Sequence, residues 1–143
     1  EVIDLSKVPD QVFSEKMAGD GVAINPTGNT VCAPADGELS LVFKTKHAFA
    51  MTLDNGVELL VHIGIDTVEL NGEGFEQLVE AGTKVKAGEP IIKFDAEFIK
   101  SKGKPLTTPV LITNHEAVIS EINGNIGATV KAGSDEIFTY KLK

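Results

Sequence analysis

The sequence contains no arginine, no tryptophan and only one cysteine, and no apolar run in it is long enough to span a bilayer. Its basic residues are all lysines and form no cluster, which argues against a nucleic-acid partner. A single cysteine excludes a disulfide within the chain, and Cys32 lies in an apolar, strand-like run that is typical of a buried structural thiol. No signal-peptide pattern opens the sequence, so we expect a cytoplasmic protein.

The 143 residues that are present suit a single domain, residues 1–143, with a hydrophobic core of its own. Hydrophobic residues make up 42%, and 14 glycines and 6 prolines punctuate short stretches rich in valine, isoleucine and threonine. This pattern favours a mostly β protein. The formal net charge of −8 would suit a basic protein partner, although acidity also serves solubility.

Two strand-like arms, residues 39–53 and 57–68, flank an Asp-Asn-Gly hairpin signal at residues 54–56. The second arm is apolar on both faces, which predicts a central strand. Further strands are predicted at residues 90–94, 109–113, 117–122 and 136–141, and short helices at residues 9–18, 75–80 and 95–100.

Each arm of this hairpin carries one histidine. If Asn-Gly forms the turn, His47 faces Gly64, and if the turn lies one residue earlier, His47 faces His62. Both registers place the two imidazoles on one face of the sheet, as opposite or diagonal neighbours with β-carbons roughly 5 to 8 Å apart. A three-residue loop with a bulge would break this parity.

Two imidazoles in one apolar hollow suit reversible phosphoryl transfer to a ring nitrogen. One ring attacks the phosphorus while the other donates a hydrogen bond to the developing negative charge. The hydroxyl of Thr45 would orient the ring of His47, and backbone amides near Gly64 would hold anionic oxygens. Apolar surroundings would exclude water and slow hydrolysis. The expected apolar neighbours of the histidines are Phe43, Phe49 and Leu60, and an expected polar neighbour is Asp66.

A Val-Lys-Ala-Gly run occurs twice, at residues 85–88 and 130–133. Each copy predicts a tight turn preceded by a buried valine, and the two copies indicate an internal duplication within a β barrel or sandwich. A weaker echo of residues 38–42 at residues 1–5 indicates that residue 1 lies inside a motif.

Residues 57–70, Val-Glu-Leu-Leu-Val-His-Ile-Gly-Ile-Asp-Thr-Val-Glu-Leu, resemble the active-site signature of the glucose-type enzyme IIA domain of the bacterial phosphoenolpyruvate-dependent sugar phosphotransferase system. Matches to the same family continue at residues 8–16, 19–24, 33–37, 45–49, 72–75 and 106–110, so the resemblance covers essentially the whole chain. It implies an all-β fold, an antiparallel sandwich of duplicated hybrid motifs with a few short helices. The family has one further Pro-x-x-Gly segment ahead of the position of Glu1, so we expect a truncated N-terminal strand.

The resemblance also implies roles for three residues. His62 matches the phosphorylated histidine, His47 the partner that stabilises the phosphoryl group, and Thr45 the hydroxyl that orients that partner. The family's domain accepts phosphate from the phosphocarrier protein HPr and passes it to a cysteine of a IIB domain during sugar uptake. Its regulatory protein targets vary, and no cofactor is implied beyond the transient phosphohistidine.

Family members dock their partners through an apolar ring around the histidines, with two acids facing a basic residue of HPr. The alternative explanation of the apolar residues is ordinary core packing, and that of the acids is a helix cap for Asp10 and a strand-end hydrogen bond for Asp66. The matching positions in this sequence are Asp10, Val12, Phe13, Met17, Phe43, Leu60, Asp66 and Val68.

Two other classes of protein compete with this interpretation. A zinc-dependent hydrolase would use His47, His62 and Asp66 as ligands, but lysostaphin-like peptidases also need a His-x-His element that the sequence lacks. A swinging-arm carrier would share the Gly-x-x-Val-x-x-Gly turns, but the Asp-Lys-Ala or Met-Lys-Met context of its modified lysine is absent. Zinc content would identify the first class, and a lipoyl or biotinyl mass shift the second.

Overall fold

The computed structural model describes residues 2–4, 20–24, 30–33, 36–53, 57–65, 67–86, 88–113, 119–124 and 138–142. The elements within these ranges are β1 (Val2–Asp4), β2 (Asp20–Ile24), β3 (Thr30–Cys32), β4 (Gly37–Val42), β5 (Ala48–Leu53), β6 (Glu58–His62), the 3-10 helix η2 (Thr67–Leu70), β7 (Phe75–Gln77), β8 (Lys84–Val85), β9 (Pro90–Phe94), α2 (Ala96–Ser101), β10 (Thr108–Ile112), β11 (Ile119–Gly124) and β12 (Phe138–Leu142). In this part of the chain, no helix is both long and apolar enough to cross a bilayer.

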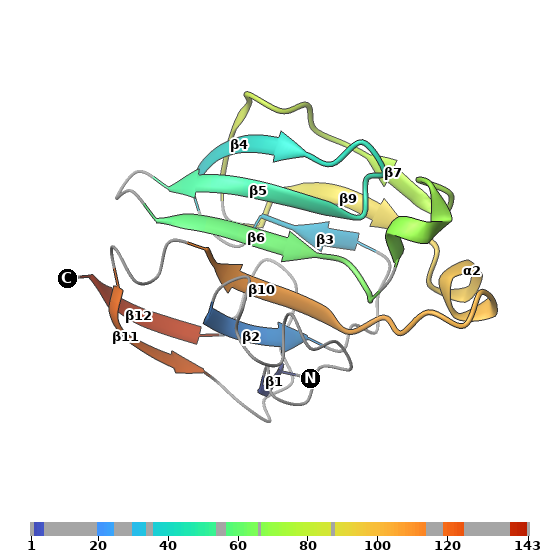
Figure 1. The fold of residues 1–143 in the computed structure, drawn as a ribbon. Helices are drawn as coiled ribbons and strands as arrows, with labels where there is room; N and C mark the ends of the chain where they lie inside the picture. Colours follow the sequence, from blue (N-terminus) through green and yellow to red (C-terminus); the bar gives the residue numbers. More distant parts are fainter. Residues whose placement is uncertain are drawn as a thin grey trace.

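Two antiparallel sheets form a sandwich, and a separate β11–β12 pair lies beside β2 (Figure 1). The larger sheet has seven strands in the order β1-β2-β10-β6-β5-β4-β8, and the smaller has the order β3-β9-β7. The predicted all-β, antiparallel fold is therefore confirmed. Strand β6 stands fourth of seven, which confirms that the arm with apolar residues on both faces is central.

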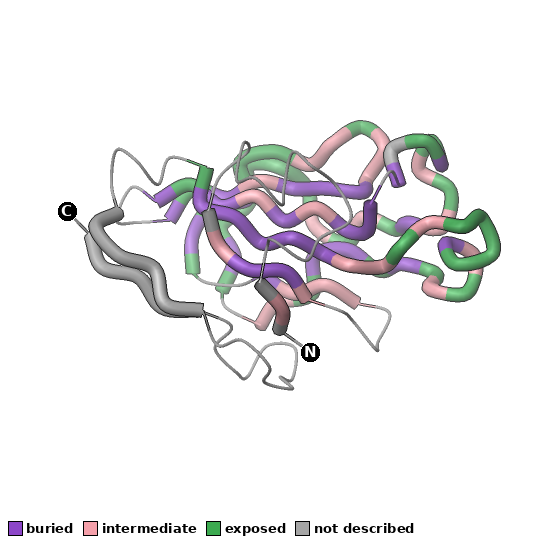
Figure 2. Tube along the Cα trace, turned by 60° about the horizontal axis from the view of Figure 1, so that its bottom comes forward, coloured by how far each residue is buried: buried purple, intermediate pink, exposed green. Residues whose placement is uncertain are grey.

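The main core lies between these two sheets. In the larger sheet, alternate residues of neighbouring strands point into it, as Leu59 and Val61 of β6 do beside Met51 and Phe49 of β5. Ile92 in the middle strand of the smaller sheet is fully buried against the same cluster. Figure 2 shows that the buried stretches follow these strands, whereas exposed residues gather in the connections.

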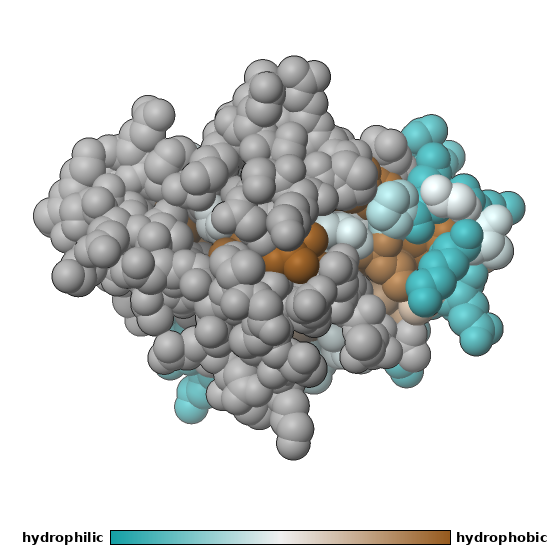
Figure 3. Space-filling model, turned by 90° about the horizontal axis from the view of Figure 1, so that it is seen from below, coloured by the Kyte–Doolittle hydropathy of each residue, from teal (hydrophilic) through white to brown (hydrophobic). Residues whose placement is uncertain are grey.

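A second, smaller cluster lies on the other face of the larger sheet. Leu111 of β10 pairs with Leu60 of β6 across the ladder, and both belong to this cluster together with Ala23 and Ile65. The face of β6 that points away from the main core thus carries Leu60 and, two residues later, His62. Seen from below, apolar surface is visible near the centre of the view and, on the right, beside polar residues (Figure 3).

Most of the predicted elements are found, with small shifts of their ends. The strand at residues 90–94 matches β9, and the strand at residues 109–113 corresponds to β10. The strands predicted at residues 117–122 and 136–141 correspond to β11 and β12. The helix predicted at residues 95–100 is α2, whereas the one predicted at residues 9–18 lies outside the described residues.

The helix predicted at residues 75–80 is wrong. Residues 75–77 instead form β7, where Phe75 pairs with Phe94 and Gln77 pairs with Ile92 of β9. Phe75 is buried and Glu76 is exposed, so this segment alternates as a strand does. Pairing with a long-range partner strand has overridden the local helical signal.

Two smaller expectations have different outcomes. Val85, ahead of the first Val-Lys-Ala-Gly turn, is 3% exposed and so is buried as predicted, while the second copy lies outside the described residues. Cys32, expected to be buried, is only partly buried at the end of β3. Desolvation nevertheless raises the pKa of its thiol, which disfavours the reactive thiolate.

Candidate active site

His47 is presented by a turn between β4 and β5. The amide of Lys46 donates to the carbonyl of Phe43 (2.7 Å), and the amide of Phe43 donates to the carbonyl of Ala48 (2.9 Å). Lys46 adopts a positive φ of 59°, a conformation that few residues other than glycine adopt. The prediction of one strand over residues 39–53 is therefore wrong, because the chain reverses here and β4 pairs with β5.

The predicted registers of the next hairpin are also wrong. Ala48 is opposite His62, and the ladder continues until the amide of Leu53 donates to the carbonyl of Val57 (2.8 Å). Three residues, 54–56, separate that pair instead of the two that a tight Asn-Gly turn would leave. His47 lies one residue before β5 and outside its alternation, so strand parity does not explain where its ring points.

The two imidazoles nevertheless come together. Their ring centroids are 4.8 Å apart and the planes are inclined at 79°. The amide of Ile63 donates to the carbonyl of His47 (2.6 Å), which ties the end of β6 to the residue that precedes β5. The ring of Phe43 stands edge-on to His47 at 5.5 Å, so an apolar wall flanks the pair. The predicted convergence of the histidines is confirmed, although a turn and not strand parity brings it about.

His47 is the more deeply buried of the two histidines, with 3% of its surface exposed. Desolvation by burial, together with the positive charge of His62, lowers the pKa of its imidazole from 6.5 to about 4. Its Nδ1 lies 2.5 Å from the hydroxyl oxygen of Thr45. The predicted contact of Thr45 with this ring is therefore confirmed, and His47 is neutral at pH 7.

His62 is partly exposed, and a hydrogen bond to the nearby backbone orients its ring. Its Nδ1 lies 2.7 Å from the carbonyl oxygen of Gly64, two residues further on. A carbonyl can only accept, so Nδ1 carries the proton. In the neutral ring the lone pair is then on Nε2, and His62 offers a nucleophilic nitrogen at that position.

Gly64 therefore contributes its carbonyl to the site, a role that was not predicted from the sequence. The amides on either side of Gly64 are engaged within the protein, since Ile63 donates to His47 and Ile65 donates to the carbonyl of Pro105 (3.0 Å). These two amides are consequently not the anion-holding donors that were expected. The glycine two residues after the histidine is the only feature of the sequence at this contact, and by itself it does not indicate a carbonyl acceptor.

The remaining predicted site residues divide into three groups. Phe43 and Leu60 are partly buried near the histidines, as expected, whereas Phe49 is fully buried in the main core opposite Val61 and does not flank them. The side chain of Val68, within η2, is not described. Five further positions lie outside the described residues, namely Asp10, Val12, Phe13, Met17 and Asp66.

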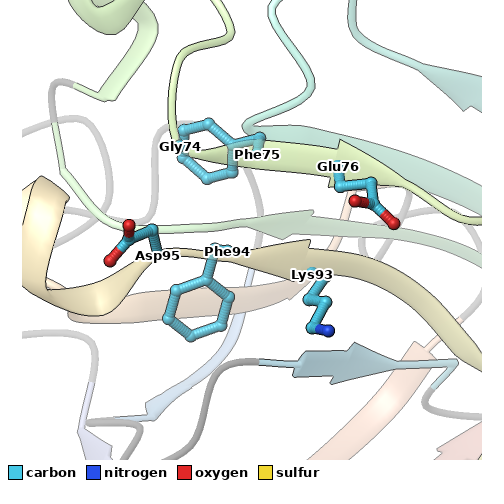
Figure 4. Close-up of a pocket in the computed structure, with 6 residues that line it drawn as sticks. All are labelled: Gly74, Phe75, Glu76, Lys93, Phe94 and Asp95. Carbon is cyan, nitrogen blue, oxygen red and sulfur yellow. The ribbon is translucent and has the colours of Figure 1, made fainter.

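A shallow pocket of about 440 Å³ lies over β7, β9 and the start of α2 (Figure 4). None of the residues that line it belongs to the histidine site. Its polar side chains have structural neighbours, because Glu76 and Lys93 occupy paired positions of β7 and β9, and Asp95 caps α2. The lining residues are Gly74, Phe75, Glu76, Lys93, Phe94 and Asp95.

Comparison with known proteins identifies the family of the chain. Residues 1–118 match the family model described as phosphoenolpyruvate-dependent sugar phosphotransferase system, EIIA 1. The chain is 46% identical over 142 residues to the glucose-specific EIIA component of Bacillus anthracis, covering 99% of this chain and 86% of that protein. It is 49% identical over 118 residues to the corresponding component of Haemophilus influenzae, covering 82% of this chain and 71% of that protein.

Longer relatives and a solved structure complete the comparison. The mannose-specific EIIBCA component of Corynebacterium glutamicum is 56% identical over 124 residues, which are 87% of this chain but only 18% of that protein. The structure of glucose permease IIA from Mycoplasma capricolum matches with a TM-score of 0.78 and 37% identity, covering 99% of this chain and 87% of that one.

These findings place the chain among phosphotransferase components, which transfer phosphate through a phosphohistidine. More narrowly, the chain belongs to the EIIA 1 family of the phosphoenolpyruvate-dependent sugar phosphotransferase system, whose members carry a phosphoryl group in sugar uptake. The family does not support the alternative of a zinc-dependent hydrolase.

Proposed function

We propose that His62 accepts a phosphoryl group on Nε2 from the phosphohistidine of HPr and passes it to a cysteine of a IIB domain. The observation that carries this proposal is the hydrogen bond from Nδ1 of His62 to the carbonyl of Gly64, because it leaves the lone pair on Nε2. As the bond from phosphorus to the donor nitrogen breaks, a bond from phosphorus to Nε2 forms. The imidazole then carries a positive charge, which the Gly64 carbonyl stabilises through a charge-assisted hydrogen bond.

His47 would stabilise the transferred group. Its ring is neutral at pH 7 and in contact with the ring of His62. His47 therefore adds no positive charge to the site before the phosphoryl group arrives. With the Thr45 hydroxyl donating to Nδ1, the proton of His47 lies on Nε2 and that nitrogen donates to a phosphoryl oxygen. The pKa of His47 would rise as negative charge accumulates beside it, which strengthens this hydrogen bond when the phosphoryl group is present.

The names of relatives support the choice of partners. EIIBCA components of Corynebacterium glutamicum combine, by name, an A component with B and C components, and this chain matches less than a fifth of such a protein. A IIB domain as acceptor follows from that arrangement. HPr as donor, a cytoplasmic location, and a docking surface that includes Phe43 and Leu60 follow from the family resemblance. Asp10, Val12, Phe13, Met17, Asp66 and Val68 would complete this surface.

Reconstituted transfer tests the proposal. The purified chain is incubated with phosphoenolpyruvate, enzyme I and HPr, and the product is followed by phosphorus NMR. We expect one phosphohistidine signal, at Nε2 of His62, and none in His62→Ala. We expect His47→Ala to be phosphorylated but to pass the group to IIB at least tenfold more slowly, because it loses a donor that acts in the transition state.

Two results would contradict the proposal. Phosphorylation of the His62→Ala protein at an unchanged level would exclude His62 as the acceptor. A signal from Nδ1 of His62 would show that the tautomer argument is wrong even if the residue is right. Thr113→Val, which changes an exposed threonine one residue after β10, serves as the control and should transfer as the unmodified chain does.

A further inference from the structure

We propose that Thr67 is a positioning residue for phosphoryl transfer, which fixes the tautomer of His62 through the two peptide groups that flank Gly64. This inference rests on the proposed function for its consequence in transfer, but not for its structural part. The residues involved come from two separate segments, the end of β6 with η2 and the connection between α2 and β10.

The first peptide group is the one that His62 contacts. The carbonyl of Gly64 and the amide of Ile65 belong to the same planar unit, and in a trans peptide they point in opposite directions. The amide of Ile65 donates to the carbonyl of Pro105 (3.0 Å). This hydrogen bond therefore turns the Gly64 carbonyl toward Nδ1 of His62 and polarises it as an acceptor.

The second peptide group precedes Gly64. Its carbonyl, that of Ile63, accepts a hydrogen bond of 2.6 Å from the hydroxyl of Thr67, whose side chain is fully buried. The amide of this second peptide group belongs to Gly64. Because hydrogen bonds hold both peptide planes, only the φ and ψ angles of Gly64 can still vary between them. The φ of Gly64 is 75°, a value that glycine adopts without strain.

Thr67 also packs directly against Gly64. A β-carbon added to Gly64 would lie 2.6 Å from Cγ2 of Thr67 and 2.9 Å from the carbonyl oxygen of Pro105. A salt bridge between Lys104 and Glu69 (3.0 Å) joins the same two segments beside these contacts. Thr67 thus supports the turn with a hydroxyl and with a methyl group, and only the hydroxyl fixes the direction of a peptide plane.

The test separates these two contributions. Thr67→Val keeps the shape of the side chain and removes the hydroxyl, whereas Thr67→Ser keeps the hydroxyl. Nitrogen-15 NMR of the histidine rings in the unphosphorylated proteins reports which nitrogen of His62 is protonated. We expect Nδ1 protonation in the unmodified chain and in Thr67→Ser, and a mixture of tautomers in Thr67→Val.

Transfer should follow the tautomer. Phosphorylation of Thr67→Val by phospho-HPr should be about tenfold slower, the loss that corresponds to one hydrogen bond to a backbone carbonyl, while Thr67→Ser should stay within about twofold. Thr108→Val is the matched control, because Thr108 is also buried and its hydroxyl donates to the carbonyl of Leu106 (2.9 Å). It should lose stability without altering the His62 tautomer.

A Thr67→Val protein that keeps Nδ1 protonated would overturn the assignment, even if its stability or its transfer rate fell. If this variant does not fold, Thr67→Ala removes the hydroxyl without placing a second methyl in the packed site and is judged by the same spectrum. Should the unmodified chain not be phosphorylated on His62, the proposed function fails, and the tautomer comparison still decides the role of Thr67.

Discussion

The two histidines have the same side chain and different environments, and their chemistry diverges for that reason. His47 is buried beside Phe43 and has a strongly lowered pKa, whereas His62 is partly exposed and donates to a backbone carbonyl. Desolvation keeps the first ring neutral, and the carbonyl assigns the proton of the second. One ring is thereby prepared to donate a hydrogen bond and the other to act as a nucleophile.

The lowered pKa of His47 predicts a pH-dependent stability. In the unfolded chain its imidazole titrates near pH 6.5, and in the folded protein near pH 4. Between these values the unfolded chain binds more protons, so the free energy of unfolding decreases as the pH falls from 6.5 to 4, by about 3 kcal/mol for the full shift. Urea unfolding at several pH values measures the change.

The matched variant for this measurement is His47→Gln, which keeps a polar side chain that does not titrate. Its free energy of unfolding should fall less steeply across the same pH window than that of the unmodified chain. Equal slopes for the two proteins would show that His47 is not held neutral by folding.

Among the elements, the short helix α2 leads directly into the connection that contains Pro105. Its first turn is capped by Asp95, whose carboxylate accepts from the amide of Phe98 (3.1 Å), and Ile99 anchors it in the main core. The amide of Asp95 donates to the carbonyl of Gly74 (2.7 Å), which fixes the start of the helix to the chain entering β7. The helix therefore sets where the connection to β10 begins.

Removal of the cap tests this element. Asp95→Ala should lower the free energy of unfolding by about 1 kcal/mol, because a backbone amide loses its acceptor and the helix N-terminus loses a negative charge. Asp95→Asn keeps an oxygen acceptor and should cost less than half as much. Thermal or urea unfolding compares the variants, and an Asp95→Ala protein as stable as the unmodified chain would exclude a capping role.

At the scale of the whole molecule, stability depends on the contact between the two sheets. Ile92 is central to it, because it lies in the middle strand of the smaller sheet, pairs with Val31 and Gln77, and is fully buried in the main core. The outer face of the larger sheet has its own, smaller cluster around Leu111, beside which the histidines lie. The site thus stands on a sheet that is packed on both faces.

Truncation of Ile92 tests the contact between the two sheets. Ile92→Ala should lower the free energy of unfolding by about 2 to 5 kcal/mol, through lost burial and the cavity left behind. Lys93→Ala, at the next and exposed position of the same strand, should change it by no more than about 0.5 kcal/mol. Similar losses for the two variants would place the main core elsewhere.

Local patterns predicted much of this fold. Apolar residues on both faces of the second hairpin arm predicted a central strand, and a short helix was predicted at residues 95–100, where α2 lies. Residues 75–77 were mispredicted, because a three-residue strand is formed by its pairing with β9 and leaves little signal of its own. The hairpin pattern identified both histidines and the threonine beside them, and the family resemblance implied a role for each.

Residue types and their order were enough to indicate the side chains that carry the chemistry, a β fold, and two histidines near a hairpin. How the rings meet depends on long-range folding, because Lys46 adopts a positive φ that its residue type does not predict, and the pairing of β5 with β6 places Ala48 opposite His62. Long-range folding also sets the tautomer of His62, since the carbonyl of Pro105, more than 40 residues away, directs the peptide group that His62 contacts. Contacts over such a separation arise from packing and are not encoded in any local pattern.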